Sequence, residues 1–156
     1  MNNPTPKFSS LYFWDFNIKS AVQMIIGSVL FQGITYMGFG MFYLPIVLIL
    51  LGLTVIGVIW LVYRYNLIMT TFREGLTVQA KITEKETLVS RQEKGRTRRS
   101  YYAKVTYTVG SETYSPRTRL PDDPLFLGMD DDGEIEIILQ EEKPQLFFFK
   151  QVFLTK

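Results

Sequence analysis

The chain has 156 residues, about one domain's length, with 17 basic and 15 acidic residues and a formal charge of +2. It contains no Cys and no His, which excludes disulfide scaffolds, Cys/His zinc sites, haem or iron–sulfur ligation, and His-dependent nucleophile pairs. The near-neutral charge also argues against a nucleic-acid-binding polycation. The charges are unevenly placed, because 44 consecutive residues between Lys19 and Arg64 carry none. The sequence therefore indicates an integral membrane protein.

The N-terminal segment, residues 1–19, is rich in aromatic residues: Phe8, Tyr12, Phe13, Trp14 and Phe16. We expect it to lie in the membrane interface as an anchor or to bind the flank of a partner. The apolar stretch that follows is longer than the 7–15 residues typical of a signal peptide and lacks a small-residue cleavage site, so we expect no cleavage.

The uncharged block from Ser20 to Tyr63 contains two lengths of roughly 20 residues, each enough to cross a bilayer. Gly38, Gly40 and Pro45 break it in the middle, and Pro45 suits the first turn of a new helix. The pattern predicts a transmembrane helical hairpin within residues 20–73, with helices at about 20–37 and 44–63 and a turn at 38–43. Basic residues flank only the outer ends (Lys7, Lys19, Arg64 and Arg73), so both termini are predicted to face the cytoplasm.

Polar and small residues form two stripes on the first predicted helix, and such residues are favoured where helices pack in membranes. One stripe is Ser20, Gln23 and Gly27, and the other is Ser28, Gln32 and Thr35. We expect one to pack against the second helix and the other to face another protein or a second copy. The simpler alternative is that the two Gln side chains reach the interfaces by snorkelling. No ionisable residue lies in either span, which argues against an ion pathway.

Residues 74–156 change to an alternating pattern that predicts a cytoplasmic β domain. Strands are predicted at 77–85, 101–109, 112–120, 134–140 and 145–154. Gly110 and Ser111 form a two-residue turn, and Pro116 makes the following strand an edge strand or stops it early. About five strands of this length predict a small antiparallel β-barrel or sandwich.

Basic residues crowd the loop between the first two predicted strands: Arg91, Lys94, Arg96, Arg98 and Arg99. They can bind anionic lipid head groups or an acidic partner, or form a solvated hairpin tip. The loop lacks interleaved aromatic residues, which argues against single-stranded nucleic acid.

Acidic residues gather before Gly133, at Asp122, Asp123 and Asp130–Asp132, without the alternating spacing of a calcium loop. We therefore expect an exposed turn and no metal site. Glu134 and Glu136 share the polar face of a strand. No phosphate loop, nucleophile elbow or metal-ligand spacing is present, so the sequence predicts neither an enzyme nor a cofactor.

The C-terminal half resembles the domain-of-unknown-function family numbered 3592. The residues that carry the resemblance are Gly75, Val78, Ala80, Ile82, Tyr107, Val109, Gly110, Tyr114, Gly133, Ile137 and Pro144. The resemblance covers about residues 75–149 and departs from the family's usual ending, where this chain has Leu139, Gln140 and a single Pro144. It implies a small bacterial membrane protein with one or two helices and a β domain, and it implies no catalytic residues.

These observations favour a non-enzymatic accessory or scaffold subunit of a bacterial inner-membrane complex. Its expected partners are membrane lipids and other membrane subunits or further copies of itself, and not nucleic acid. A second hypothesis is a membrane-anchored regulator that binds a peptide or ligand along an exposed edge of the β domain, such as the Pro116 strand. A third, a membrane enzyme, has no residues that the sequence can name.

Overall fold

The computed structural model describes residues 4–39, 44–91, 97–124, 127, 129 and 133–154. Its contacts divide the chain into two compact units. The helical unit is Leu11–Met69, and the β unit is Met1–Ser10 with Thr70–Lys156. The predicted β domain, residues 74–156, lies within the β unit, whereas the predicted N-terminal segment, residues 1–19, is divided between the two units.

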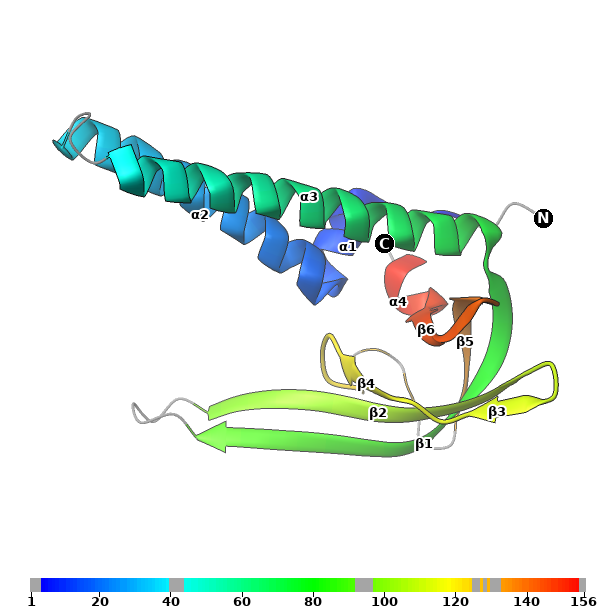
Figure 1. The fold of residues 1–156 in the computed structure, drawn as a ribbon. Helices are drawn as coiled ribbons and strands as arrows, with labels where there is room; N and C mark the ends of the chain where they lie inside the picture. The colour runs from blue at the N-terminus through cyan, green and yellow to red at the C-terminus, as the bar shows by residue number, and fades with distance from the viewer. Residues whose placement is uncertain are drawn as a thin grey trace. The chain divides into compact units, whose positions relative to one another are not determined.

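Three helices run through the N-terminal half: α1 Phe8–Trp14, α2 Phe16–Phe39 and α3 Leu44–Glu74 (Figure 1). Two of them, α2 and α3, are long and apolar enough to cross a membrane, as predicted. Both exceed their predicted bounds: α2 begins at Phe16, and α3 continues past Tyr63 until Gly75. At 1.5 Å per residue the 31 residues of α3 span about 46 Å, more than the roughly 30 Å of a hydrocarbon core. Of the predicted turn, residues 40–43 lie outside the described residues.

A single residue, Asp15, separates α1 from α2. The backbone N–H of Ile18 donates to Asp15 Oδ1 at 2.9 Å, which is the arrangement of an N-cap. The predicted aromatic segment is thus a short helix followed by the first turn of α2. Three of its aromatic side chains, Phe8, Phe13 and Phe16, are exposed, and Phe13 is 72% exposed, whereas Tyr12 and Trp14 are half-buried.

The described part of the β unit forms an open antiparallel sheet of six strands, with the short helix α4 Lys150–Leu154 after the last. The strand order is β3-β2-β1-β5-β6, with β4 also pairing to β2. The bounds are β1 Leu76–Arg91, β2 Thr97–Val109, β3 Glu112–Tyr114, β4 Arg117–Leu120, β5 Glu134–Gln140 and β6 Lys143–Phe149. The predicted antiparallel β domain is therefore confirmed, but the sheet is open and is not closed into the predicted barrel or sandwich of about five strands.

Local differences from the predicted strands have clear causes. Pro116 divides the third predicted strand into β3 and β4 along one edge of β2, where its carbonyl accepts a hydrogen bond from the Val105 N–H at 3.1 Å. The last predicted strand ends at Phe149, and the chain then turns into α4. In β1 the register shifts between Ile82 and Glu84, and Figure 1 shows the strand bending between its halves.

The sheet curls until aromatic side chains of non-neighbouring strands meet. The rings of Tyr107 on β2 and Phe147 on β6 lie 5.5 Å apart, and the Tyr107 hydroxyl donates to the Pro144 carbonyl at 2.5 Å. Tyr114 on β3 stacks on Tyr107 at 5.8 Å. Among the described strands β3 and β6 are not hydrogen-bonded neighbours. Side chains, rather than a backbone ladder, therefore join this seam.

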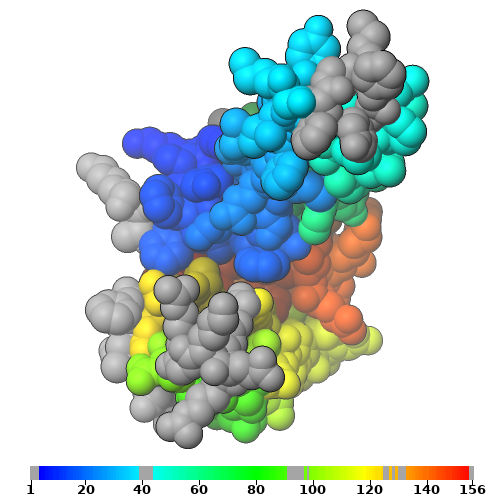
Figure 2. Space-filling model, turned by 90° about the vertical axis from the view of Figure 1, so that its left-hand side faces the viewer, coloured from blue at the N-terminus to red at the C-terminus, as the bar shows by residue number. Residues whose placement is uncertain are grey.

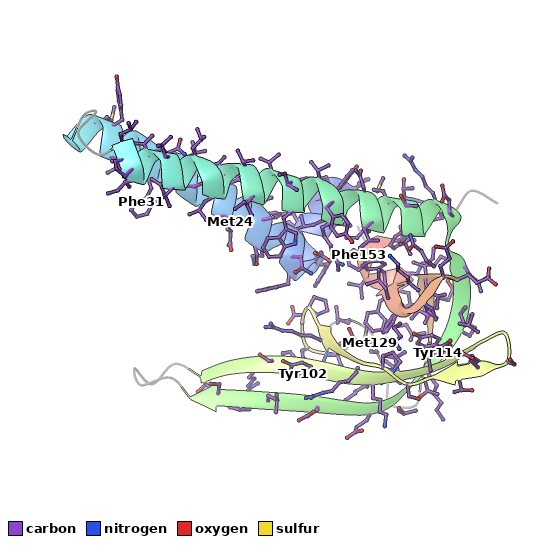
Figure 3. The ribbon with its side chains drawn as sticks, in the orientation of Figure 1. Met24, Phe31, Tyr102, Tyr114, Met129 and Phe153 are labelled. Carbon is purple, nitrogen blue, oxygen red and sulfur yellow. The ribbon has the colours of Figure 1, made fainter. Side chains whose placement is uncertain are left out.

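Aromatic residues from the end of α3 and from the last strand and helix of the β unit form a second apolar cluster. Phe72, from the last turn of α3, lies 6.4 Å from Phe148 of β6 and 6.0 Å from Phe153 of α4, between ring centroids. Phe153 projects from α4 in Figure 3. Gly75 permits this packing, because a Cβ there would lie 2.2 Å from the Thr71 carbonyl oxygen and 2.7 Å from that of Leu139.

Candidate interaction sites

The far half of the β1–β2 pair extends beyond the rest of the sheet. On β1, pairing to β5 stops at Lys81, and on β2, pairing to β4 stops at Tyr101. Residues 87–91 and 97–100 therefore form a two-stranded ribbon, which we call the hairpin arm. Leu88 is 44% exposed and Val89 is 60% exposed. Such a ribbon is marginally stable in water by itself, so its exposed apolar residues, together with edges that pair with no other described strand, make it a candidate docking surface.

Three of the five predicted basic residues lie on the hairpin arm. Arg99 pairs in register with Val89 and is exposed; Arg98 pairs with Ser90, and Arg91 with Thr97. Lys94 and Arg96 lie outside the described residues. The described backbone therefore brings three of the five basic residues together on the arm, next to exposed apolar side chains.

Ser28 and Gln32, from one polar stripe of α2, contact α3. Ser28 Oγ lies 2.7 Å from Thr54 Oγ1, and the Gln32 Nε2 donates to the same oxygen at 3.4 Å. Thr35, one turn further along, is half-buried. The role of Thr54 as the partner on α3 was not predicted. It is the sole residue with a side-chain hydroxyl in the 44–62 stretch, and this could have marked it as the contact for the polar stripe.

The helices also approach closely at Gly57 of α3. A Cβ there would lie 2.9 Å from Ile25 Cγ1 and 3.1 Å from Met24 Cε. By contrast, a Cβ on Gly27 would meet no atom within 4 Å. Figure 2 shows α2 and the beginning of α3 side by side with their side chains at the surface. In the stripe of Ser20, Gln23 and Gly27, Gln23 is exposed, whereas Ser20 and Gly27 are half-buried.

A buried ion pair that the sequence analysis missed joins α3 to the start of α2. Arg64 Nη2 donates to Asp15 Oδ2 at 2.8 Å, and Arg64 Nε donates to the same oxygen at 3.2 Å. The side chains are 17% and 5% exposed, respectively. Asp15 is the only acidic residue among the first 73, and Arg64 is the first basic residue after the uncharged block. Their positions on either side of that block were the sequence signal that could have predicted the pair.

The outer face of the sheet carries an exposed charged group. Arg117 pairs with Glu86 at 2.5 Å, and its guanidinium lies 4.4 Å from the Tyr102 ring centroid. Glu84, Lys104 and Ala103 complete a shallow depression. Exposed pairs of this kind contribute about 0–1 kcal/mol, so the group is consistent with ordinary surface stabilisation.

Two tyrosines at the seam titrate above their ordinary range. Burial, followed by the neighbouring Tyr114, raises the pKa of Tyr107. The Tyr114 hydroxyl donates to Glu112 Oε2 at 2.5 Å, and this hydrogen bond raises its pKa. Both groups therefore stay neutral at physiological pH.

The predicted acidic turn is only partly described. Asp122 Oδ1 accepts a hydrogen bond from the Asp123 N–H at 2.8 Å, while Asp130–Asp132 lie outside the described residues. Within the described residues no group of three or more His, Cys, Asp or Glu is placed to hold a metal ion.

No family model, curated protein or solved structure matches the chain significantly. The resemblance to the family numbered 3592 therefore stays a prediction.

Proposed function

We propose that the chain is a non-enzymatic accessory or scaffold subunit of a bacterial inner-membrane complex, with both termini in the cytoplasm. The observation that carries this proposal is the contrast between its units. Apolar residues of α2 and α3 remain exposed along both helices, for example Phe31 at 63% and Ile49 at 64%, whereas the β unit buries a core of its own. Figure 3 shows Phe31 projecting from α2. Hydrocarbon is the solvent that suits such a surface.

The hairpin arm supports a role of the β unit at the membrane surface. Basic residues near an anionic cytoplasmic leaflet contribute about 1 kcal/mol each. Here Arg91, Arg98 and Arg99 accompany Leu88 and Val89, which are exposed enough to enter the head-group region. The arm therefore combines charge attraction with a small apolar surface, which is a pairing that favours anionic lipid over bulk water.

The lipid contact can be tested on the full chain in nanodiscs. Because the protein has no Cys, Val89→Cys can carry a single environment-sensitive fluorophore. We expect a blue shift in anionic discs relative to zwitterionic discs, reversed by high salt and absent after Arg91, Arg98 and Arg99 are changed to Gln. A probe at Ser111→Cys, in the turn before β3, is the matched control. Identical spectra in both lipids would remove the lipid role.

The subunit role is tested separately by purification in mild detergent followed by native mass spectrometry. The proposal predicts copurifying membrane proteins or defined multiples of the chain. A monomer under all mild conditions would contradict it.

Among the described strands, β3 and β4 have a backbone partner on one side alone, which favours one alternative, a regulator that binds an extended peptide. These strands pair with β2 on one side, and strand addition along the other side is a common mode of peptide recognition. A selected peptide that protects amide hydrogens of Glu112–Leu120 from exchange would favour this function, whereas unchanged exchange would count against it.

A further inference from the structure

The hairpin arm has two faces that differ in composition. Side chains alternate between the two faces of a strand, and residues directly opposite each other on an antiparallel pair share a face. The register of β1 and β2 runs without a shift from residue 84 to residue 91, so the alternation is unbroken along the arm. Val89 and Leu88 therefore lie on opposite faces, which we call the Val89 face and the Leu88 face.

The Val89 face continues the core side of the sheet beyond the core itself. On that side of β2 and β4, Ala103 is 1% exposed and Leu120 is 3% exposed. On the arm no further strand of the described sheet lies beside β1 or β2, and Val89 is 60% exposed. The inward face of the sheet thus becomes an outward surface along the arm.

The charges of the Val89 face are of one sign. Arg99 is exposed and lies directly opposite Val89, and Arg91 holds the next register position on the same face. Among the described residues, no acidic residue shares this face from 85 to 91 on β1 or from 97 to 103 on β2. An anionic lipid surface therefore attracts this face without an opposing repulsion from it.

The Leu88 face differs because carboxylates lie next to it. Arg98 is the one basic residue that the register places on this face of the described arm, and Glu86 and Glu84 follow along β1. Arg117 contacts Glu86 at 2.5 Å, and Lys104 is paired in register with Glu84, so these four charges balance one another. An anionic surface would repel both carboxylates and would compete with Glu86 for Arg117.

We infer that the hairpin arm contacts anionic lipid through its Val89 face and turns its Leu88 face toward water. The inference rests on the lipid contact proposed above and adds which side of the arm makes it. Val89 then enters the head-group region, and Arg99, directly opposite, is positioned to bind lipid phosphate. Leu88, which is less exposed at 44%, remains a solitary apolar residue at the surface, as is common in soluble domains.

Two single-cysteine variants of the full chain in nanodiscs test the face. Val89→Cys and Leu88→Cys, neighbours on opposite faces, carry the same environment-sensitive fluorophore. In anionic discs the probe at position 89 should shift to the blue and be quenched by nitroxide-labelled head groups, more strongly than the probe at position 88. An equal or larger response at position 88 would overturn the inference while leaving the lipid contact intact. A response at neither position would refute the lipid contact itself.

A matched pair of charge variants checks the electrostatic argument in the same discs. Arg99→Gln and Arg98→Gln remove the same charge from adjacent residues that the register places on opposite faces. With the probe at position 89, Arg99→Gln should weaken the arm's partition onto anionic lipid about 5-fold, and Arg98→Gln should weaken it less. An equal or larger loss with Arg98→Gln would contradict the assignment of the Val89 face.

Discussion

Replacing Asp15 by Asn isolates the contribution of the buried ion pair. Asn keeps a side-chain oxygen for the Ile18 N–H and is an equally good N-cap, so the cap at the start of α2 survives. What is lost is the two-pronged contact with Arg64, at 2.8 and 3.2 Å. Removing one partner of a buried pair costs about 3–5 kcal/mol. Because Arg64 is 17% exposed and can form replacement contacts with lipid head groups, we expect Asp15→Asn to lower the free energy of unfolding by about 2–3 kcal/mol.

The assay is denaturant titration in mixed micelles, followed by tryptophan fluorescence. The chain has two Trp residues, Trp14 beside Asp15 and Trp60 one turn before Arg64, so both report on this end of the hairpin. The double variant Asp15→Asn, Arg64→Met removes the stranded cation as well and should be more stable than the sum of the single changes predicts. A single variant within about 0.5 kcal/mol of wild type, or strictly additive changes, would refute the reasoning.

Three further outcomes follow from the packing. Gly57→Leu should destabilise the hairpin by about 1–3 kcal/mol in the same titration, because the Cβ would lie 2.9 Å from Ile25, whereas Gly52→Leu, with no atom within 4 Å, should change little. Gly75→Ala should lower the free energy of unfolding by about 3 kcal/mol or more, because the added Cβ would clash with backbone atoms. Circular dichroism should show this as a lower melting temperature of the sheet, and an unchanged melting temperature would contradict the packing. Because burial raises the pKa of Tyr107, the contribution of its neutral side chain to the free energy of unfolding is fully present below a pH of about 10 and is lost as the pH rises through the raised pKa of the folded state. We therefore expect stability to decline at alkaline pH, and Tyr107→Phe to make that decline less steep. An equally steep decline in the variant would show that Tyr107 is not its source.

The long elements were predictable because their signals are local. An uncharged stretch of two bilayer lengths with Pro45 near its middle gives two helices, and alternation in β1, β2 and β5 gives the strands and their inward residues Ala80, Val105 and Ile137. The division of the edge at Pro116 also follows from a missing N–H.

The remaining features depend on contacts between distant segments. The curl of the open sheet brings Tyr107 into contact with Phe147 and Pro144, which are distant in sequence. The Asp15–Arg64 pair requires a 49-residue return of the chain. Which polar stripe faces α3 depends on the position of Thr54, and a single helical wheel does not reveal it.

The central claim is that the chain crosses a bilayer twice and returns to the side from which it started. Because the sequence has no Cys, single cysteines at Thr5, Met37 and Glu141 can be labelled in intact cells with a membrane-impermeant maleimide. Met37, which is 91% exposed, should react from outside, while Thr5 and Glu141 should react only after permeabilisation. Reaction of Met37 under the same conditions as the two end positions would contradict the account.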